Sequence, residues 1–197
     1  MALRHAHSSS RTFLFVLGVA TLAMAASPAH KKNYPIPGHG TLELQLPAGL
    51  SDLLDQPEGG GPPAIALRPD DGGSYGVMIV VAWRDTETKD FGSAEHLRRA
   101  LETERAPYLR QVQATDVPIV TLSGGPNPGV AYLLVDKSVV GKPREEGNWP
   151  YMRQGVIRAG DLLLKYMIMM YSRDPDPAPA VEAILLNAVH HPATDSK

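Results

Sequence analysis

Three methionines lie within four positions of the stretch LLLKYMIMMYS, residues 162–172. Thioether sulfur is a soft ligand that suits Cu(I). Met167 and Met169 are two residues apart, so on an extended strand they share one face. Met152 lies across an expected hairpin, and the histidine pair 190–191 would add nitrogen ligands. One hypothesis is therefore a copper-handling protein with Met152, Met167 and Met169 as metal ligands.

The same stretch is also typical of the central strand of a sheet. Both of its faces are mostly apolar, and methionine commonly fills gaps in protein cores. It is too short, and at Lys165 too charged, for a membrane-spanning helix of about 20 residues. We favour the core interpretation, with a strand that is covered on both faces. Met167→Ala would then remove a buried side chain and destabilise the domain by roughly 2–5 kcal/mol.

Aromatic and cationic residues at strand ends are candidates for partner recognition, because such residues anchor many interfaces. Trp149 and Tyr151 flank Pro150, and Arg84 follows Trp83 at the end of an expected strand. We name Trp149, Tyr151 and Arg84 as candidate ligand- or partner-binding residues. For Trp83 we expect burial at the edge of the sheet.

No motif of an enzyme or a cofactor site is complete. The LSGG at 122–125 joins two expected strands and opens no helix, which phosphate binding would need. Lys142 is followed by Pro143, where a P-loop requires Ser or Thr. His-Glu-x-x-His does not occur. The Gly-x-Ser-x-Gly spacing occurs as GGSYG at 72–76, but it leads into an expected strand and opens no helix, so the serine nucleophile elbow is incomplete. We predict no catalytic residue and no cofactor, and favour a non-catalytic protein that binds another protein or a small ligand. A hydrolase with a site dispersed over loops is the alternative.

The chain has no cysteine, which excludes disulfides, thiolate zinc sites and cysteine nucleophiles. Its N-terminus has the pattern of an export signal. Arg4 and Arg11 precede the apolar run 13–23, and small residues at Ala23 and Ala25 fit a signal peptidase site. We expect residues 1–25 to be a signal peptide and the mature protein to be periplasmic or secreted.

Removal of that segment would leave 17 basic and 21 acidic residues, a net charge of −4. The basic residues are scattered, so nucleic acid is not an expected partner. No membrane span is expected after signal cleavage.

The order of elements predicts an α+β fold: a single, mostly antiparallel sheet of about six or seven strands packed with two main helices. The first helix begins at the N-cap Ser93 and runs to about Arg105, because Pro107 interrupts helical hydrogen bonding. The second begins at Pro177 after the cap Asp176. Two hairpins lie between the helices, and the second turns at 159–161.

The boundaries that we expect are a signal peptide at 1–25, a flexible leader at 26–40, one α+β domain at 41–191 and a tail at 192–197. The leader interpretation depends on the Pro- and Gly-rich sequence SPAHKKNYPIPGHG.

The layout as a whole resembles a known group. An early strand ends in LPAGL, a central strand ends in VVAWR, a helix and meandering strands follow, and the last long strand runs into SRD before a short helix. This order is similar to that of small exported PsbP-like and DcrB-like α/β sandwich proteins. The resemblance implies a role in binding or assembly and supplies no catalytic residues.

The export prediction is tested by the intact mass of the protein recovered from its native host. We expect a mass that lacks residues 1–25. A mass that retains Met1 to Ala25 would contradict cleavage.

Overall fold

The computed structural model describes residues 29–83, 92–112, 117–145 and 147–194. These residues form two antiparallel sheets and two helices. The elements are β1 His30–Ile36, β2 Gly40–Leu46, β3 Leu50–Asp55, β4 Ala64–Pro69, β5 Tyr75–Trp83, α1 Ala94–Gln111, β6 Val120–Thr121, β7 Gly129–Val135, β8 Tyr151–Ala159, β9 Leu162–Met170, α2 Ala178–Leu186 and β10 Val189–His191. The larger sheet has seven strands in the order β3-β4-β5-β9-β8-β7-β6, and the smaller has the order β1-β2-β10.

The α+β class with two helices and antiparallel strands is confirmed, but the prediction of a single sheet is wrong. The strand β2 does not join the larger sheet; it pairs with β1 on one side and β10 on the other. Its leucines alternate, and all three are buried, so β2 contributes one apolar face to the core from a separate layer. Sequence alternation shows that a strand is half buried but not which sheet it joins.

The expected flexible leader at 26–40 is also corrected, because His30–Ile36 form β1. Tyr34 and Ile36 are buried and anchor this strand. Pro35 between them made the segment look like a loop. In the structure β1 is an edge strand, where a proline is tolerated. The predicted signal peptide lies outside the described residues.

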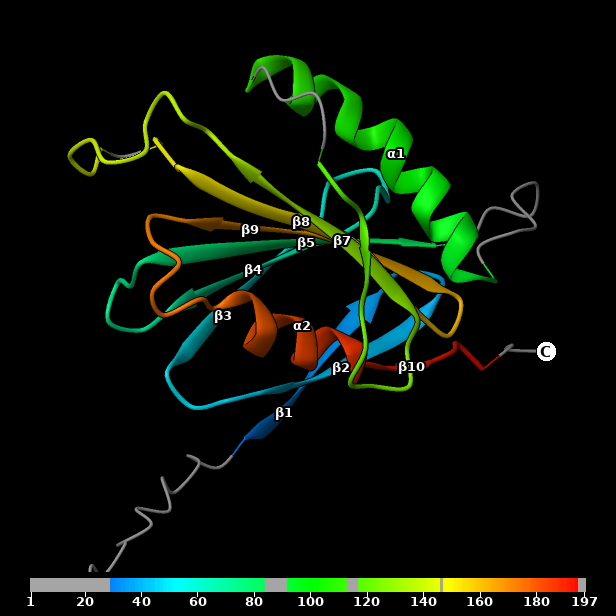
Figure 1. The fold of residues 1–197 in the computed structure, drawn as a ribbon. Helices are drawn as coiled ribbons and strands as arrows, with labels where there is room; N and C mark the ends of the chain where they lie inside the picture. Colours follow the sequence, from blue (N-terminus) through cyan, green and yellow to red (C-terminus); the bar gives the residue numbers. More distant parts are fainter. Residues whose placement is uncertain (1–28, 84–91, 113–116, 146, 195–197) are drawn as a thin grey trace, which may run out of the picture.

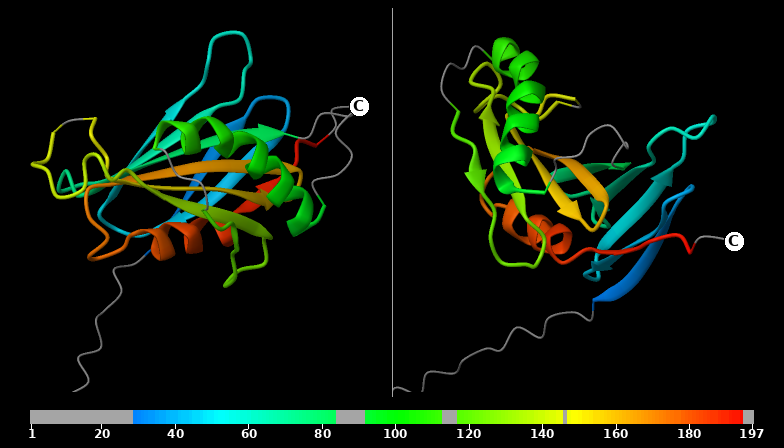
Figure 2. Two further views of the ribbon diagram at one scale, coloured as in Figure 1. Left: turned by 45° about the horizontal axis from the view of Figure 1, so that its top comes forward. Right: turned by 90° about the vertical axis from the view of Figure 1, so that its right-hand side faces the viewer.

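The elements form three layers (Figure 1). The helix α1 lies on one face of the seven-stranded sheet, and α2 with the three-stranded sheet lies on the other. The view along the sheet in the right panel of Figure 2 separates these layers and shows how strongly the larger sheet curves. We call the side of α2 the closed face and the side of α1 the outer face.

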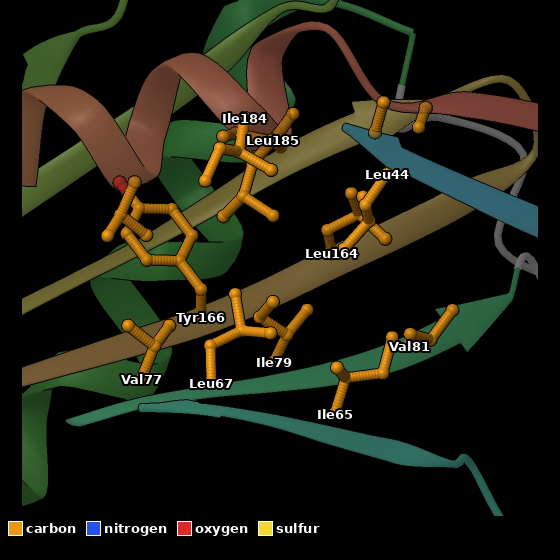
Figure 3. Packing of buried hydrophobic residues seen from close by; sticks show 14 of the residues in the cluster. Leu44, Ile65, Leu67, Val77, Ile79, Val81, Leu164, Tyr166, Ile184 and Leu185 are labelled. Carbon is orange, nitrogen blue, oxygen red and sulfur yellow. The ribbon is translucent and has the colours of Figure 1, made fainter. Parts of the chain in front are cut away.

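The closed face contains the main core (Figure 3). Leu164 and Tyr166 of β9 point toward α2 and β2 and pack among residues such as Leu44, Ile79 and Leu185. A second, smaller core lies beneath α1, where the helix packs mainly on β7 and β8. The closed face of the larger sheet is therefore covered by α2 and the smaller sheet. On its outer face the described cover is the single helix α1.

The helix α1 begins as predicted and ends later. The Ser93 hydroxyl accepts a hydrogen bond from the backbone N–H of His96 (3.3 Å). The helix then continues through Pro107, where we expected it to break. Proline removes one helical hydrogen bond, but the rest of the helix is secured by packing and by side chains. Arg98 donates to the carbonyl of Ile119 (2.7 Å), and Arg105 donates to that of Val117.

The end of the chain departs from the prediction in one respect. The Asp176 carboxylate accepts from the N–H of Ala178 (3.0 Å) at the start of α2, although Pro177 is the residue before the helix and not its first. The histidine pair 190–191 lies beyond this helix in β10, where the His190 ring contacts the carbonyl of His39 (Nε2 to O, 2.7 Å).

A buried ionic cluster attaches α2 to the closed face. The Glu182 carboxylate accepts from Arg153 (Nε to Oε1, 2.7 Å) and from the Tyr166 hydroxyl (2.6 Å). Burial, with the nearby Glu182 charge, raises the pKa of Tyr166 well above its ordinary value. Burial alone would lower the pKa of Arg153, but the hydrogen bond and charge of Glu182 outweigh it and raise that pKa. Gly155 leaves room for the phenol, since a Cβ there would lie 2.5 Å from the hydroxyl.

The hairpin of β8 and β9 is confirmed, with its turn at Gly160–Asp161. The expectation that β9 is covered on both faces is wrong for half of its length. Its even-numbered residues are buried on the closed face, whereas Met167 and Met169 on the outer face are only half buried. The helix α1 covers the outer face at Leu163 and leaves the methionines toward solvent.

This difference makes a stability prediction. Leu164→Ala removes a fully buried side chain from the main core and should lower the free energy of unfolding by roughly 2–5 kcal/mol. Met167→Ala, on the half-open face of the same strand, should lower it by only about 1 kcal/mol. Denaturant unfolding of the two variants beside the parent measures both values. Equal losses would mean that the outer face is as well packed as the closed one.

Candidate binding groove

The part of the outer face beside α1 has a continuous row of apolar side chains. Antiparallel register places Leu53 opposite Ala66, Ala66 opposite Met78, and Met78 opposite Met167. Directly opposed residues point to the same side of a sheet. Leu53 is 68% exposed and Met78 is 47% exposed, although both lie on a sheet face. The row therefore crosses β3, β4, β5 and β9 without complete cover from the described residues.

The next row of the register contains a gap. Gly76 lies opposite Met169, and Met169 lies opposite Met152 on its other side. A Cβ built on Gly76 would meet nothing within 4 Å, so the missing side chain leaves open space above the strand. A groove of about 720 Å³ lies there. Its floor includes Ala66, Gly76, Met78 and Met169.

One wall of the groove is an aromatic stack. Trp149 packs on Tyr171 with ring centroids 4.0 Å apart, and the Arg144 guanidinium lies 4.1 Å from the centre of the Tyr171 ring. Hydrogen bonds hold both ends of the stack. The Tyr171 hydroxyl donates to the carbonyl of Glu145 (3.1 Å), and Arg144 donates to that of Gly73 (3.2 Å). The loop before β8 is thus fixed against the turn before β5.

The charges at the groove are unevenly distributed. Arg68 and Arg144 are exposed at its rim, and Asp70 is the single carboxylate among its lining residues. Tyr75 contacts the groove at the same end, but its side chain packs on the closed face opposite Met170. Burial, and secondarily the charge of Asp71, raises the pKa of its phenol. That phenol stays protonated at neutral pH. The groove therefore combines an apolar floor with a net positive rim.

A second hollow of about 300 Å³ separates the groove from α1. Tyr108 of α1 lines one side of it, and Trp149, Met152 and Met169 line the other. Trp149 and Met169 belong to both hollows. Trp149 therefore stands between the helix-covered part of the outer face and the open part.

The residues predicted from the sequence lie in different places. Trp149 is in the wall of the groove, whereas Tyr151 packs toward the closed face and lines a separate hollow of about 260 Å³. Arg84 lies outside the described residues. Met152, Met167 and Met169 all lie on the outer face. Trp83 is half buried and stacks on His39 with centroids 4.3 Å apart.

Sequence reasoning missed Gly76, Met78, Arg144 and Tyr171. The first two belong to a strand that we described only as apolar on both faces. Their register opposite Met169 and Met167 creates the groove, and register is set by pairing across the sheet. Arg144 and Tyr171 are 27 residues apart and meet because the start of β8 lies beside the end of β9. A correct register would have shown that Gly76, which has no Cβ, lies next to a pair of methionines and leaves space above the sheet.

The groove offers little acid–base chemistry. Histidine is absent from its described lining, and Ser51 and Asp70 are its hydroxyl and carboxylate besides tyrosine. Among the residues that the structure describes, no group of three or more His, Asp or Glu is placed to hold a metal ion. The strongly raised pKa values belong to buried tyrosines in the two cores. The arrangement is suited to contact with an amphipathic molecule that has an apolar surface and negatively charged groups beside it.

Neither described helix is both long enough and apolar enough to cross a lipid bilayer. No protein-family model matches the sequence, and a search of curated proteins finds no match.

The solved structures that are similar to this chain include two that match most of its length. The solution structure of cyanobacterial PsbP (CyanoP) from Synechocystis sp. PCC 6803 has 13% sequence identity and a TM-score of 0.49, and the match covers 89% of this chain and 99% of that one. A crystal structure from Bacteroides thetaiotaomicron VPI-5482 has 10% identity and a TM-score of 0.51 over 86% of this chain; the match spans 50% of that protein. A PsbP structure is thus among the solved structures that are similar to this chain, and PsbP-like proteins are the group that the sequence layout resembles. At these identities the likeness concerns the fold alone.

The aromatic wall makes a spectroscopic prediction. In a Trp83→Phe background, Trp149 is the remaining tryptophan of the chain. Tyr171→Ala should shift its emission to longer wavelength, because the ring loses its stacking partner and meets water. Loss of the aromatic pair should also lower the free energy of unfolding by about 0.5–1.5 kcal/mol, in addition to the loss that follows from the smaller buried apolar area. Tyr171→Phe is the control, since it keeps the stack and removes only the hydroxyl. An unchanged emission maximum in Tyr171→Ala would contradict the stack.

Proposed function

We propose that this protein is an exported, non-catalytic binding module, and that its groove receives an amphipathic helix of a protein partner. The observation that carries the proposal is the groove above Gly76. There an apolar floor lies open beside a helix-covered half of the same sheet face.

The width of the open surface supports a helix as the occupant. Neighbouring strands lie about 4.8 Å apart, so β4, β5 and β9 present a floor on the order of 10–15 Å wide. A helix with its side chains is about 10–12 Å across. The helix α1 already packs on β7 and β8 of this face. A partner helix beside α1 would bury Met78 and the neighbouring apolar row as α1 buries the second core.

The rim supports an acidic partner. Arg68 has an exposed side chain, and Arg144 presents its guanidinium at the same end of the groove. Carboxylates on the partner would meet these two cations. Complementary charge mainly increases the association rate and selects the partner, while the apolar floor supplies the affinity.

Export is the part of the proposal supported by the sequence alone. The basic residues, the apolar run 13–23 and the small residues at Ala23 and Ala25 have the pattern of a cleaved signal. A module without cysteine suits an oxidising compartment, because no thiol is available there for unwanted disulfides.

Two synthetic amphipathic helical peptides test the groove. They share one leucine stripe and carry either Glu or Lys at the polar positions. We expect the Glu peptide to bind at least tenfold more tightly than the Lys peptide by isothermal titration. Gly76→Leu should abolish binding, because it fills the groove at a position with no left-handed strain. Arg68→Glu should reduce or reverse the preference for the Glu peptide.

The matched control is Gly61→Leu, which adds the same side chain in the 56–63 loop, where a Cβ meets only ordinary contacts with Pro57. This variant should bind like the parent. Equal binding of both peptides, or binding that survives Gly76→Leu, would sink the proposal.

A further inference from the structure

Four of the seven methionines of the chain form two adjoining cross-strand pairs on the outer face. Met78 of β5 is directly opposite Met167 of β9, and Met169 of β9 is directly opposite Met152 of β8. The structure adds Met78 to the three methionines that the sequence suggested. We propose that Met78, Met152, Met167 and Met169 form a thioether site for Cu(I).

The register supplies the geometry of such a site. Directly opposed residues of an antiparallel pair have Cβ atoms about 4.5–5.5 Å apart, and diagonal neighbours are about 7–8 Å apart. Met167 and Met169 are two residues apart on one strand and lie between the other two methionines. The unbranched side chain of methionine has three rotatable bonds, so the sulfurs of Met167 and Met169 can converge on one ion together with that of either Met78 or Met152. Met78 and Met152 lie two strands apart and do not share one ion, so the four methionines form two overlapping triads. Three adjacent strands of a rigid sheet hold the ligand set.

The exposure of the four methionines argues against a purely structural role. Met170, the next residue of the same strand, is fully buried on the closed face and behaves as core. Met78 is 47% exposed and the other three are half buried; Met152 and Met169 line the hollow beside the groove, and Met167 lies next to Met78 in the register. Core methionine is expected at positions like that of Met170. Methionines grouped on an accessible face leave their sulfurs available to an ion from solvent.

The surroundings favour a soft ion over a hard one. The other polar residue in the row of Met167 is Gln154, which is engaged by the Tyr132 hydroxyl. Lys165 lies two residues along the same face and is paired with Glu104 of α1. Histidine and free carboxylate are absent from the described residues of these two rows. Thioether ligands without nitrogen or carboxylate select Cu(I) rather than Zn²⁺ or Mg²⁺.

This site overlaps the proposed helix groove at Met78 and Met169, yet it requires different chemistry. Helix binding needs apolar surface, which leucine supplies as well as methionine. Metal binding needs sulfur, which leucine lacks. Met→Leu substitutions roughly conserve volume and are usually tolerated in packed sites. The two proposals can therefore fail separately.

The experiment is an anaerobic titration of the full chain, labelled with ¹³C at the methionine methyl groups, with Cu(I) buffered by a competing chelator. We expect the methyl signals of Met78, Met152, Met167 and Met169 to move together, because one ion exchanges between the two triads that share Met167 and Met169, and to saturate at one equivalent. The Met170 methyl is the internal control and should stay in place. The double variant Met167→Leu/Met169→Leu should bind Cu(I) at least tenfold more weakly, with a parent-like unfolding curve.

Met170→Leu is the matched substitution on the closed face and should leave the Cu(I) affinity unchanged. Three results would each overturn the site: no movement of the four methyl signals at one equivalent, movement of only one or two of them, or an unchanged affinity in the double variant. Glu-peptide binding in the same double variant reports on the groove separately. Its survival beside lost Cu(I) binding is the result expected if both proposals hold.

Discussion

The carboxylate of Glu182, buried between Arg153 and Tyr166, determines where α2 lies on the larger sheet. Removal of one partner from a buried ion pair is strongly destabilising, because the other charge stays buried and uncompensated. The three groups come from α2, β8 and β9, so the contact fixes the register of the helix over two central strands. The loop before β7 secures the other end of α2, where Asn127 donates to the carbonyl of Ala188 (2.8 Å). With α2 fixed at both ends, β2 and its neighbours complete the cover of the closed face.

Because α2 and the smaller sheet both cover the closed face, α1 is the one described helix left to cover the outer face. A strand such as β9 contributes alternate residues to two faces, and the closed face receives its large aliphatic and aromatic members. On the outer face a single described helix spans β7 and β8. Its fourth turn is anchored by Arg105 to the segment that leads to β6. The remaining half of that face carries side chains that tolerate both water and contact: methionine, alanine and a glycine. A flexible, polarisable surface of this kind is typical of binding sites.

The sequence predicted β5, the two hairpins between the helices and the start of α1, because these depend on local alternation, turns and caps. It did not predict β3, and it placed the start of α2 one residue too early. The alternation of β2 was read correctly, yet its sheet was not, since one-faced burial is the same in either sheet. The continuous apolar run of β9 predicted two covered faces. Burial of its outer face depends on whether α1 reaches that far, and helix placement is a tertiary property. The strand β1 was missed because Pro35 and the neighbouring lysines have the composition of a loop, and only the pairing with β2 reveals an edge strand. Of the groove, Trp149 was identified from its type and position, whereas Gly76 and Met78 required the register.

Because the proposed metal site and the proposed helix groove share Met78 and Met169, occupancy of one would affect the other. Coupling between two sites is reciprocal in free energy: an ion that draws the thioethers together changes helix affinity by the same factor by which the helix changes ion affinity. The sign depends on which shape of the floor the ion stabilises. A Cβ on Gly76 would meet nothing within 4 Å, so the space above this residue would accommodate a Met169 side chain turned over the groove as well as one turned toward Met152. An ion that holds Met169 toward Met152 would widen the groove above Gly76 and favour the helix. The glycine and the methionines would then couple the two proposed sites through side-chain rotation above an unchanged backbone.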